Sequence, residues 1–523
     1  MYALKNSFIA VKSKMTLLFF LLMQLSLFAQ KDNFSVSKVS SASKADTSLN
    51  KRDVQIIHAD KLQFYTNEKG QPIRKLVGNV QLKQDSTLLY CDSAFLLKEE
   101  NLVKMFGHVK ITDGDSIEAT SNKLDYDGNN QKAKLIGDAV LSDSKMILIA
   151  DILYYEKSSG IGYYLNEGTL VNGETILTSK KGYYHSNTTE AYFSDNVHIE
   201  DPQYALDSDT LMFNTSTKVT YFFGNTSIYN EESTILCNNG TYDTKKQVAT
   251  FGANTTILNS PQTLWADSLY YEKQNGYGKV MKSFKWKDDE MKIGLNGTDA
   301  EYFENKKEIF SYNRPILNAI IEEDTLFLRG DTIIARNDLI KSFKAFKKVR
   351  VFKTDLQAVC DSLFYNNSDS VLQLFQSPIL WNEGSEMKSD SVFVFIKTGK
   401  VDQIKFINNA FILSQSKGKL FDQIKGKKIT AFFKSSKLEK MLVVKNAESL
   451  YFGKDEQDNY MGGNQSKSAK MWIYTSKNKI KKIVFLENPE AVFTPLSQMS
   501  KTDIYLKGFE TNFELKPSSK YDL

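Results

Sequence analysis

Apolar and polar residues alternate along Ile117–Asp143, and a Gly-Asn-Asn segment at residues 128–130 interrupts this alternation near its middle. Alternation with a period of two is typical of β-strands, because successive side chains of a strand point to opposite faces. A Gly-Asn-Asn segment between two such runs favours a hairpin turn. The stretch therefore predicts two long strands joined by a turn.

The same outline recurs along nearly the whole chain. Leu148–Tyr155 and Leu264–Tyr271 repeat its first half, and Leu76–Leu82 repeats its second half. Each repeat is marked by the polar residue that follows a small one, and successive marks are 29 to 32 residues apart as far as Asp390. This period predicts a repeat architecture, and the last two spacings, of 37 and 43 residues, indicate that it loosens. The marks are Asp60, Asp92, Asn122, Asp151, Lys180, Asp209, Asn238, Asp267, Asp299, Asp331, Asp361, Asp390, Lys427 and Lys470.

Each repeat also predicts a bend at the centre of its strands. Apolar or small residues precede the mark by one and three positions and follow it by two and four, so the inward face changes there. One extra residue at the mark, a β-bulge, would change the face and bend the strand. In the second strand Leu135, Gly137 and Ala139 share one parity, and a glycine inside a strand is a natural bend. We expect the marks to form a polar ladder rather than catalytic pairs, because no second partner recurs beside them.

The first residues are typical of an exported protein. Lysines precede the almost wholly apolar run Thr16–Phe28, which predicts a secretory signal peptide over residues 1–29, with an uncleaved anchor as the alternative. Residues 30–53 are rich in Ser, Lys and Asp and predict a flexible leader. No second apolar run is long enough to cross a bilayer, so we expect the mature chain to be exported and soluble.

The composition of the remaining chain favours an all-β protein, since it is rich in Tyr and Phe, poor in Pro and lacks helical periodicity. The net charge of +5, from 67 basic and 62 acidic residues, does not indicate nucleic-acid binding. Lys341–Arg350 alternates charged with apolar residues, and we interpret it as one solvated strand face. The alternative is a patch that binds a lipid phosphate.

Cysteine and histidine positions argue against a disulfide framework and a metal site. Cys91, Cys237 and Cys360 each directly precede a mark, where other repeats have Ala or Ser. This predicts small buried slots in non-adjacent repeats, too far apart for a disulfide. The four histidines lie at unrelated offsets without metal-ligand spacing. We therefore expect neither an enzyme nor a cofactor.

Short motifs resemble the OstA-like family, which includes the periplasmic lipopolysaccharide-export protein LptA and the N-terminal domain of LptD. They are Ala59-Asp60, Gly78-Asn79-Val80, Gly107-His108-Val109, Ala150-Asp151 and Gly224-Asn225. The resemblance is strongest over residues 54–170, extends weakly to residue 413, and is closest to the large OstA-like exported proteins of Bacteroidetes-type bacteria. It implies an elongated, twisted, open β-jellyroll of creased hairpins with a V-shaped, apolar trough. It further implies a periplasmic protein that carries the lipid A acyl chains of lipopolysaccharide toward the outer membrane. Partners would be other Lpt-type proteins, or further copies head to tail, through edge-strand pairing.

The leading hypothesis is a non-enzymatic lipid conduit driven by a separate motor, because the sequence has no nucleotide-binding loop. If the inward residues instead close on each other, they form a dry core. A second hypothesis is a parallel β-helix that binds or degrades polysaccharide, and a third is a structural envelope protein that assembles by its edges. The predicted lining residues are Leu62, Phe64, Val80, Leu82, Val109, Ile111, Leu124, Tyr126, Leu153 and Tyr155.

The repeats divide the chain into three predicted regions after the leader. Residues 54–172 form the OstA-like domain, and residues 173–413 form further repeats of the same kind. Residues 414–523 form a diverged segment that caps the array or docks to a partner. Within it, the Lys- and Gly-rich stretch Lys417–Lys428 and the stretch Lys454–Lys470, which contains Asp, Gly and Ser, predict loops or insertions.

Overall fold

The computed structural model describes residues 53–523, apart from residues 69, 115–116, 144–145, 203, 232, 291, 322–323, 337–341, 367, 398–399, 435–436, 458 and 477–478. The predicted signal peptide and all but the last residue of the predicted leader lie outside the described residues. The described chain forms two compact units. The first unit comprises residues 53–260 and 267–275, and the second comprises residues 261–266 and 276–523.

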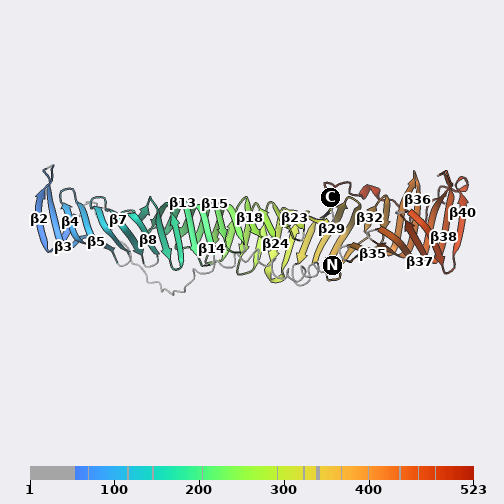
Figure 1. Cartoon of the computed structure of the whole chain (residues 1–523), viewed down its shortest axis with the longest axis horizontal. Helices are drawn as coiled ribbons and strands as arrows, with labels where there is room; N and C mark the ends of the chain where they lie inside the picture. Colours follow the sequence, from blue (N-terminus) through green and yellow to red (C-terminus); the bar gives the residue numbers. More distant parts are fainter. Residues whose placement is uncertain are drawn as a thin grey trace, which may run out of the picture. The chain divides into compact units, whose positions relative to one another are not determined.

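In the first unit, strands follow one another side by side in chain order (Figure 1, blue to green). Its strands are β1 Gln55–His58, β2 Lys61–Thr66, β3 Pro72–Gln84, β4 Thr87–Leu97, β5 Leu102–Asp113, β6 Ile117–Asp127, β7 Lys132–Asp143, β8 Met146–Glu156, β9 Ile161–Tyr164, β10 Gly168–Asn172, β11 Thr175–Ser179, β12 Lys181–His185, β13 Glu190–Asp201, β14 Tyr204–Asn214, β15 Val219–Tyr229, β16 Thr234–Asp243, β17 Val248–Phe251, β18 Thr255–Asn259 and β20 Leu269–Glu272.

The second unit continues the same kind of structure, with three 3₁₀ turns at Glu304–Lys306, Leu496–Gln498 and Phe513–Leu515. Its strands are β19 Gln262–Ala266, β21 Tyr277–Val280, β22 Phe284–Asp288, β23 Ile293–Gly297, β24 Asp299–Phe303, β25 Glu308–Tyr312, β26 Ile316–Ile321, β27 Asp324–Arg329, β28 Thr332–Arg336, β29 Ser342–Lys353, β30 Leu356–Asn366, β31 Val371–Phe375, β32 Ile379–Asn382, β33 Ser385–Lys388, β34 Ser391–Lys397, β35 Lys400–Lys417, β36 Leu420–Lys434, β37 Lys437–Lys454, β38 Tyr460–Ser476, β39 Lys479–Leu486 and β40 Glu490–Pro495. Within residues 53–523, less the gaps given above, no helix is long and apolar enough to cross a membrane.

Strand pairing is antiparallel throughout the pairs that the structure describes. The hairpin predicted for Ile117–Asp143 is present as β6 and β7, which pair from Glu118 with Ser142 to Asp127 with Lys132. β7 then pairs with β8, and β13 with β14 and β15 in the same way. The predicted all-β jellyroll of creased hairpins is therefore confirmed. The parallel β-helix alternative is wrong, because its coils would place neighbouring strands in parallel.

Each long strand takes part in two layers, because its two halves pair on either side of the bend. β3, for example, pairs with β1 through residues 81–83 and with β2 through residues 72–77. Layer A contains the halves that end at turns such as residues 84–87 and 172–175. Layer B contains the halves that end at turns such as residues 127–132 and 185–190. Inward side chains of both layers join one hydrophobic core, with Leu82 of layer A and Leu76 of layer B both fully buried.

The bends fall at the predicted marks, but their geometry differs from a one-residue bulge at the mark. In the β4–β5 pair the register shifts between Tyr90 and Ser93, around Asp92. The extra residue belongs to the neighbouring strand, where Gly107 and His108 both have positive φ angles of 74° and 40°. Two residues of β5 opposite one residue of β4 form a β-bulge, which bends the strand, and glycine adopts the left-handed conformation at low cost. The mark is therefore the residue that lies opposite the bulge of the neighbouring strand.

The cysteine predictions are confirmed. Cys91, Cys237 and Cys360 are free and buried. Burial raises the pKa of the Cys91 and Cys237 thiols to about 11 and that of the Cys360 thiol to about 12. The described part of Lys341–Arg350 lies in β29, where Lys344 is exposed and Ala345 and Val349 are fully buried. It forms a strand with one solvated face, as expected.

The loops predicted after residue 414 are wrong. Residues 420–434 and 460–476 form the long strands β36 and β38, and these long strands account for the wider spacing of the last marks. Lysines alternate there with buried side chains such as Ile424 and Ile429, so a high lysine content does not indicate a loop. The tail after β40 packs on layer A of the second unit. There the Leu506 backbone N–H donates to Gln423 Oε1 at 2.8 Å, and the Arg329 guanidinium donates to the terminal Leu523 O at 2.7 Å.

Candidate functional site

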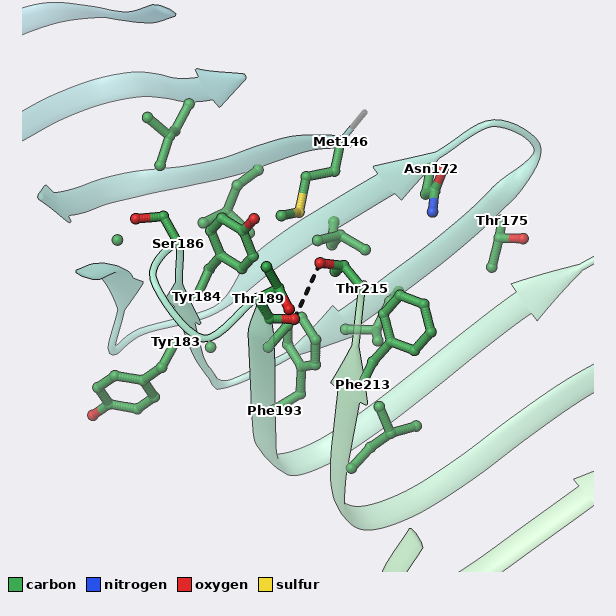
Figure 2. Close-up of a pocket in the computed structure, with 18 of the residues that line it drawn as sticks. Met146, Asn172, Thr175, Tyr183, Tyr184, Ser186, Thr189, Phe193, Phe213 and Thr215 are labelled. Carbon is green, nitrogen blue, oxygen red and sulfur yellow. Dashed lines mark hydrogen bonds between the residues drawn. The ribbon is translucent and has the colours of Figure 1, made fainter. Parts of the chain in front are cut away.

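The first unit contains a cavity of about 370 Å³ between layers A and B. This volume lies in the range of small-molecule sites, roughly 300–1,000 Å³. Its lining extends from Ile117 to Thr220 and comes from strands β6 to β15 and their turns. Figure 2 shows lining side chains such as Met146, Phe193 and Phe213 pointing toward one another, whereas the Tyr183 ring points away from them.

The layer A wall is a row of aliphatic side chains in register across neighbouring strands. Leu148 of β8 pairs with Leu170 of β10, which pairs with Leu177 of β11, which pairs with Ile199 of β13. All four side chains line the cavity. Directly opposed positions share one face of a sheet, so this register produces a continuous apolar wall. A wall of this kind is suited to an extended hydrocarbon chain.

The layer B wall alternates small residues with aromatic ones. Gly162 of β9 pairs with Tyr184 of β12, Tyr184 pairs with Ala191 of β13, and Ala191 pairs with Phe213 of β14. At Gly162 the opposite layer packs closely against the backbone, because a Cβ there would lie 2.8 Å from Leu141 Cδ2. Both walls of the cavity are therefore largely apolar.

A second glycine, Gly182, leaves room for an aromatic ring to pack against the backbone. The Tyr164 ring lies against Gly182, where a Cβ would come within 2.5 Å of the ring carbon Cε1. The Tyr164 hydroxyl lies 2.6 Å from Ser179 Oγ, and the ring is fully buried. Burial raises the pKa of this phenol, so it stays neutral. Tyr164 thus belongs to the packed floor beside the cavity, and Gly182 makes that packing possible.

Polar side chains surround the rim of the cavity. Asn172 and Thr175 lie on the two strands of one layer A hairpin, opposite Thr189 and Thr215 of layer B (Figure 2). Thr175 Oγ1 donates to Asp201 Oδ2 at 2.8 Å, and Thr215 Oγ1 donates to the Thr189 carbonyl at 3.1 Å. An apolar interior with a hydroxyl-rich rim matches an amphiphile whose tail is buried and whose head is solvated.

Charge at the rim is sparse among the described lining residues. Lys218 is the charged side chain in this lining, and its Nζ lies 5.8 Å from the centre of the Phe213 ring. Burial raises the pKa of the Tyr204 phenol, which also lines the cavity, so this group is neutral too.

The ten predicted lining residues fall into three groups. Seven lie in the buried core between the layers, two are exposed, and Tyr155 lines the cavity. The exposed pair, Leu62 and Phe64, lies on β2, the first strand of layer B in the described chain. Leu62 pairs with the buried Leu76 and so shares the inward face, but no strand of the described residues 53–523 covers it on its other side. The seven buried residues are Val80, Leu82, Val109, Ile111, Leu124, Tyr126 and Leu153.

Sequence reasoning missed most of the cavity lining, which lies after residue 155. The second position after a mark is a leucine in some repeats, such as Leu153 after Asp151 and Leu211 after Asp209. After Lys180 the same position is Gly182, and this change was a signal in the sequence. The loss of a side chain at an inward position indicates either close packing or an opening. In this case the glycine accepts the Tyr164 ring beside the opening.

The marks have a structural role at the bends. Asp92 Oδ2 lies 2.8 Å from His108 Nδ1, and Asn79 Nδ2 donates to Asp60 Oδ2 at 3.0 Å. A Cβ on Gly107 would lie 2.2 Å from Asp92 Oδ2, so an added side chain requires this exposed carboxylate to move. Within the described residues no group of three or more His, Cys, Asp or Glu side chains could hold a metal ion. At these two bends the marks therefore make polar contacts with the neighbouring strand.

These features define a class of protein: an all-β repeat protein with an apolar cavity between two creased layers. Residues 51–209 match the family model described as OstA-like protein, so the resemblance to the OstA-like family is confirmed over this range. A comparison with curated proteins finds no match.

One solved structure that the chain is similar to is LptH from Pseudomonas aeruginosa. It is described as the LptA-homologous periplasmic component of the conserved lipopolysaccharide transport device. The alignment has 11% sequence identity and a TM-score of 0.19, and it covers 20% of this chain and 79% of LptH.

Proposed function

We propose that this chain is a periplasmic carrier of lipopolysaccharide-type lipid and that its cavity holds acyl chains. The observation that carries the proposal is the continuous aliphatic wall from Leu148 to Ile199 beneath a polar rim. Burial of a hydrocarbon tail against such a wall is favourable by roughly 25 cal/mol per Å². The OstA-like match over residues 51–209 supports this class of function.

The chemistry of this role is binding without covalent catalysis. The wall offers side chains of similar character along its length, so an acyl chain can shift along it without leaving a single deep minimum. Direction then comes from a separate energy source, because passive binding alone gives none. The sugars and phosphates of the lipid extend past the rim into solvent.

The first edge of the array supports assembly with a partner or a second copy. Strands β1 and β2 expose Ile57, Leu62, Phe64 and Tyr65, and an uncovered edge strand is a template for strand addition. The substitution Phe64→Lys places a charge on this edge and is expected to reduce self-association, measured by light scattering over a concentration series. Unchanged association would place the contact elsewhere.

Lipid extraction and mass spectrometry of the purified full chain test the proposal directly. We expect an acylated glycolipid to copurify with the wild-type chain. The variant Leu170→Trp places a larger ring in the layer A wall and is expected to lose most of this lipid. Ile176→Trp is the matched control, because Ile176 lies next to Leu177 in β11 but is 41% exposed.

The rival role as a purely structural envelope protein gives a different result. It predicts a chain that folds and associates through its edges without bound lipid, and Leu170→Trp would then behave like Ile176→Trp. Absence of lipid from all three proteins, each folded by far-UV circular dichroism, would overturn the carrier proposal.

A further inference from the structure

The outer face of layer B carries a row of tyrosine rings behind the cavity. Tyr154 of β8 pairs with Tyr163 of β9, which pairs with Tyr183 of β12. Neighbouring residues along these strands, such as Leu153 and Gly182, are buried, so the three rings point away from the core. Figure 2 shows this orientation for Tyr183. The rings therefore lie on the reverse side of the cavity wall.

The three rings are stacked, and the stack ends at Tyr154. The ring centres of Tyr154 and Tyr163 are 4.9 Å apart and those of Tyr163 and Tyr183 are 5.5 Å apart, with angles between the planes of 11° and 16°. Rings stacked at the spacing of neighbouring strands, about 4.8 Å, stand upright on the sheet. Both faces of Tyr163 are therefore covered by other rings. The second face of Tyr154 is directed toward Lys134 of β7, whose Nζ lies 5.8 Å from the ring centre.

A hollow of about 280 Å³ lies at this end of the stack. Five of its lining residues lie directly opposite one another across β5 to β9, and they are called the outer row below. Directly opposed positions share one face of a sheet, so the outer row places two ammonium groups, one carboxylate and the stacked rings on the same face. The outer row is Lys104, Asp125, Lys134, Tyr154 and Tyr163.

Charged groups in the next row of lining residues make contacts of their own. Lys132 Nζ donates to Glu156 Oε1 at 2.7 Å. Asp127 Oδ1 accepts the backbone N–H groups of Asn129 and Asn130 at 2.9 Å and 3.1 Å. These contacts fix the side of the hollow that borders the turn at residues 127–132. The outer row therefore supplies the groups that face a ligand.

The chemistry of the outer row suits a saccharide. The C–H bonds on one side of a sugar ring carry a slight positive charge and pack against the negative face of an aromatic ring such as Tyr154. Sugar hydroxyls donate to the exposed Asp125 carboxylate and accept from the ammonium groups of Lys104 and Lys134. A hydrocarbon tail offers these charged groups no hydrogen bond, and a phosphate would lie beside the like charge of Asp125.

The hollow and the lipid cavity adjoin at one turn of layer B. Tyr155 lines both of them. The turn at residues 156–161 joins β8 to β9, and its Gly160 lines the cavity whereas Glu156 lines the hollow. A molecule that leaves the cavity over this turn therefore reaches the outer row.

We propose that the outer row binds the saccharide of the same amphiphile whose acyl chains lie in the cavity. This inference rests on the proposed function and defines the ligand as a glycolipid. Tyr154 packs against a sugar ring, while Asp125 and the two lysines orient its hydroxyls. Occupation of both sites by one molecule raises its affinity above that of either part, because the second contact is intramolecular.

A lipid-free oligosaccharide, released from lipopolysaccharide by mild acid hydrolysis, tests the outer row in the full chain. Saturation-transfer difference NMR measures its binding, and we expect a signal with the wild-type chain. Tyr154→Ala is expected to raise the Kd roughly threefold to tenfold, the loss of one aromatic contact, whereas Tyr154→Phe keeps the ring and the affinity. Asp125→Asn keeps the shape and is expected to raise the Kd roughly tenfold. The matched control is Tyr221→Ala, because Tyr221 lies on β15, outside the hollow, next to the inward Phe222.

Wild-type affinity in both Tyr154→Ala and Asp125→Asn would overturn this assignment. Displacement of the oligosaccharide by millimolar inorganic phosphate would also overturn it, because the hollow would then be an anion site. Lipid extraction from the same wild-type protein keeps the two proposals apart. Copurified lipid without oligosaccharide binding would overturn the saccharide site alone, whereas oligosaccharide binding without copurified lipid would count against the carrier role.

Discussion

The bend at Gly107 provides a direct measure of how the marks shape the fold. In Gly107→Ala, an L-residue must adopt a φ angle of 74°, which costs about 1–2 kcal/mol in the left-handed region. The new Cβ would also lie 2.2 Å from Asp92 Oδ2 and would displace the hydrogen bond between Asp92 and His108. Loss of that exposed hydrogen bond adds about 0.5–1 kcal/mol. The local free energy of opening is therefore expected to fall by about 1.5–3 kcal/mol.

Native-state amide hydrogen exchange suits this measurement, because it reports local opening in a chain of two units. Amides of β4 and β5 are expected to exchange roughly 10- to 150-fold faster in the variant. Gly114→Ala is the matched control, because Gly114 has a φ angle of 61° and open space where the Cβ would lie. Its effect is expected to be limited to the backbone cost of about 1–2 kcal/mol.

A double variant separates the two contributions. In Gly107→Ala with Asp92→Ala the steric conflict is gone, so exchange is expected to return toward the Gly114→Ala value. An effect of Gly107→Ala no larger than that of Gly114→Ala would refute the reasoning, since it would show that the mark does not pack against the bend.

Three further predictions concern the ion pair of Lys157 with Asp113, a buried thiol and the C-terminal tail. Burial of Asp113 would raise its pKa, but hydrogen bonds from Ser86 and Lys157 outweigh burial and hold the pKa below its ordinary value. The ion pair is therefore stabilising above the ordinary carboxyl range, and this contribution is lost as pH falls through the lower folded-state pKa. The difference in the free energy of unfolding between the wild type and Asp113→Asn, measured by urea denaturation, should stay constant from pH 7 to about pH 5, and a fall within that range would contradict this. Because burial raises the pKa of Cys91 to about 11, iodoacetamide should alkylate it roughly 100-fold more slowly at pH 8 than in denaturant, measured by mass spectrometry. Arg329→Met should speed release of Leu523 by carboxypeptidase, whereas Arg336→Met, at an exposed ion pair with Glu308, should leave the rate unchanged.

Local pattern alone was sufficient to predict the repeat and its elements. The alternation along Ile117–Asp143 predicted β6 and β7 because inward and outward positions alternate along a strand whatever the strand packs against. The small residues before the marks predicted the cysteine slots for the same reason. The geometry of the bends was less accessible, since the left-handed pair at Gly107 and His108 is evident only from the backbone angles.

Only the tertiary structure decided which part of the furrow is filled and which is open. Leu82 and Leu170 are both inward leucines in layer A, yet Leu82 lies in a closed core and Leu170 lines a cavity. The difference lies in which side chains of the opposite layer and of the neighbouring strands surround each leucine. A one-dimensional pattern records the face to which a side chain points, but closure of the space between two layers depends on both layers at once.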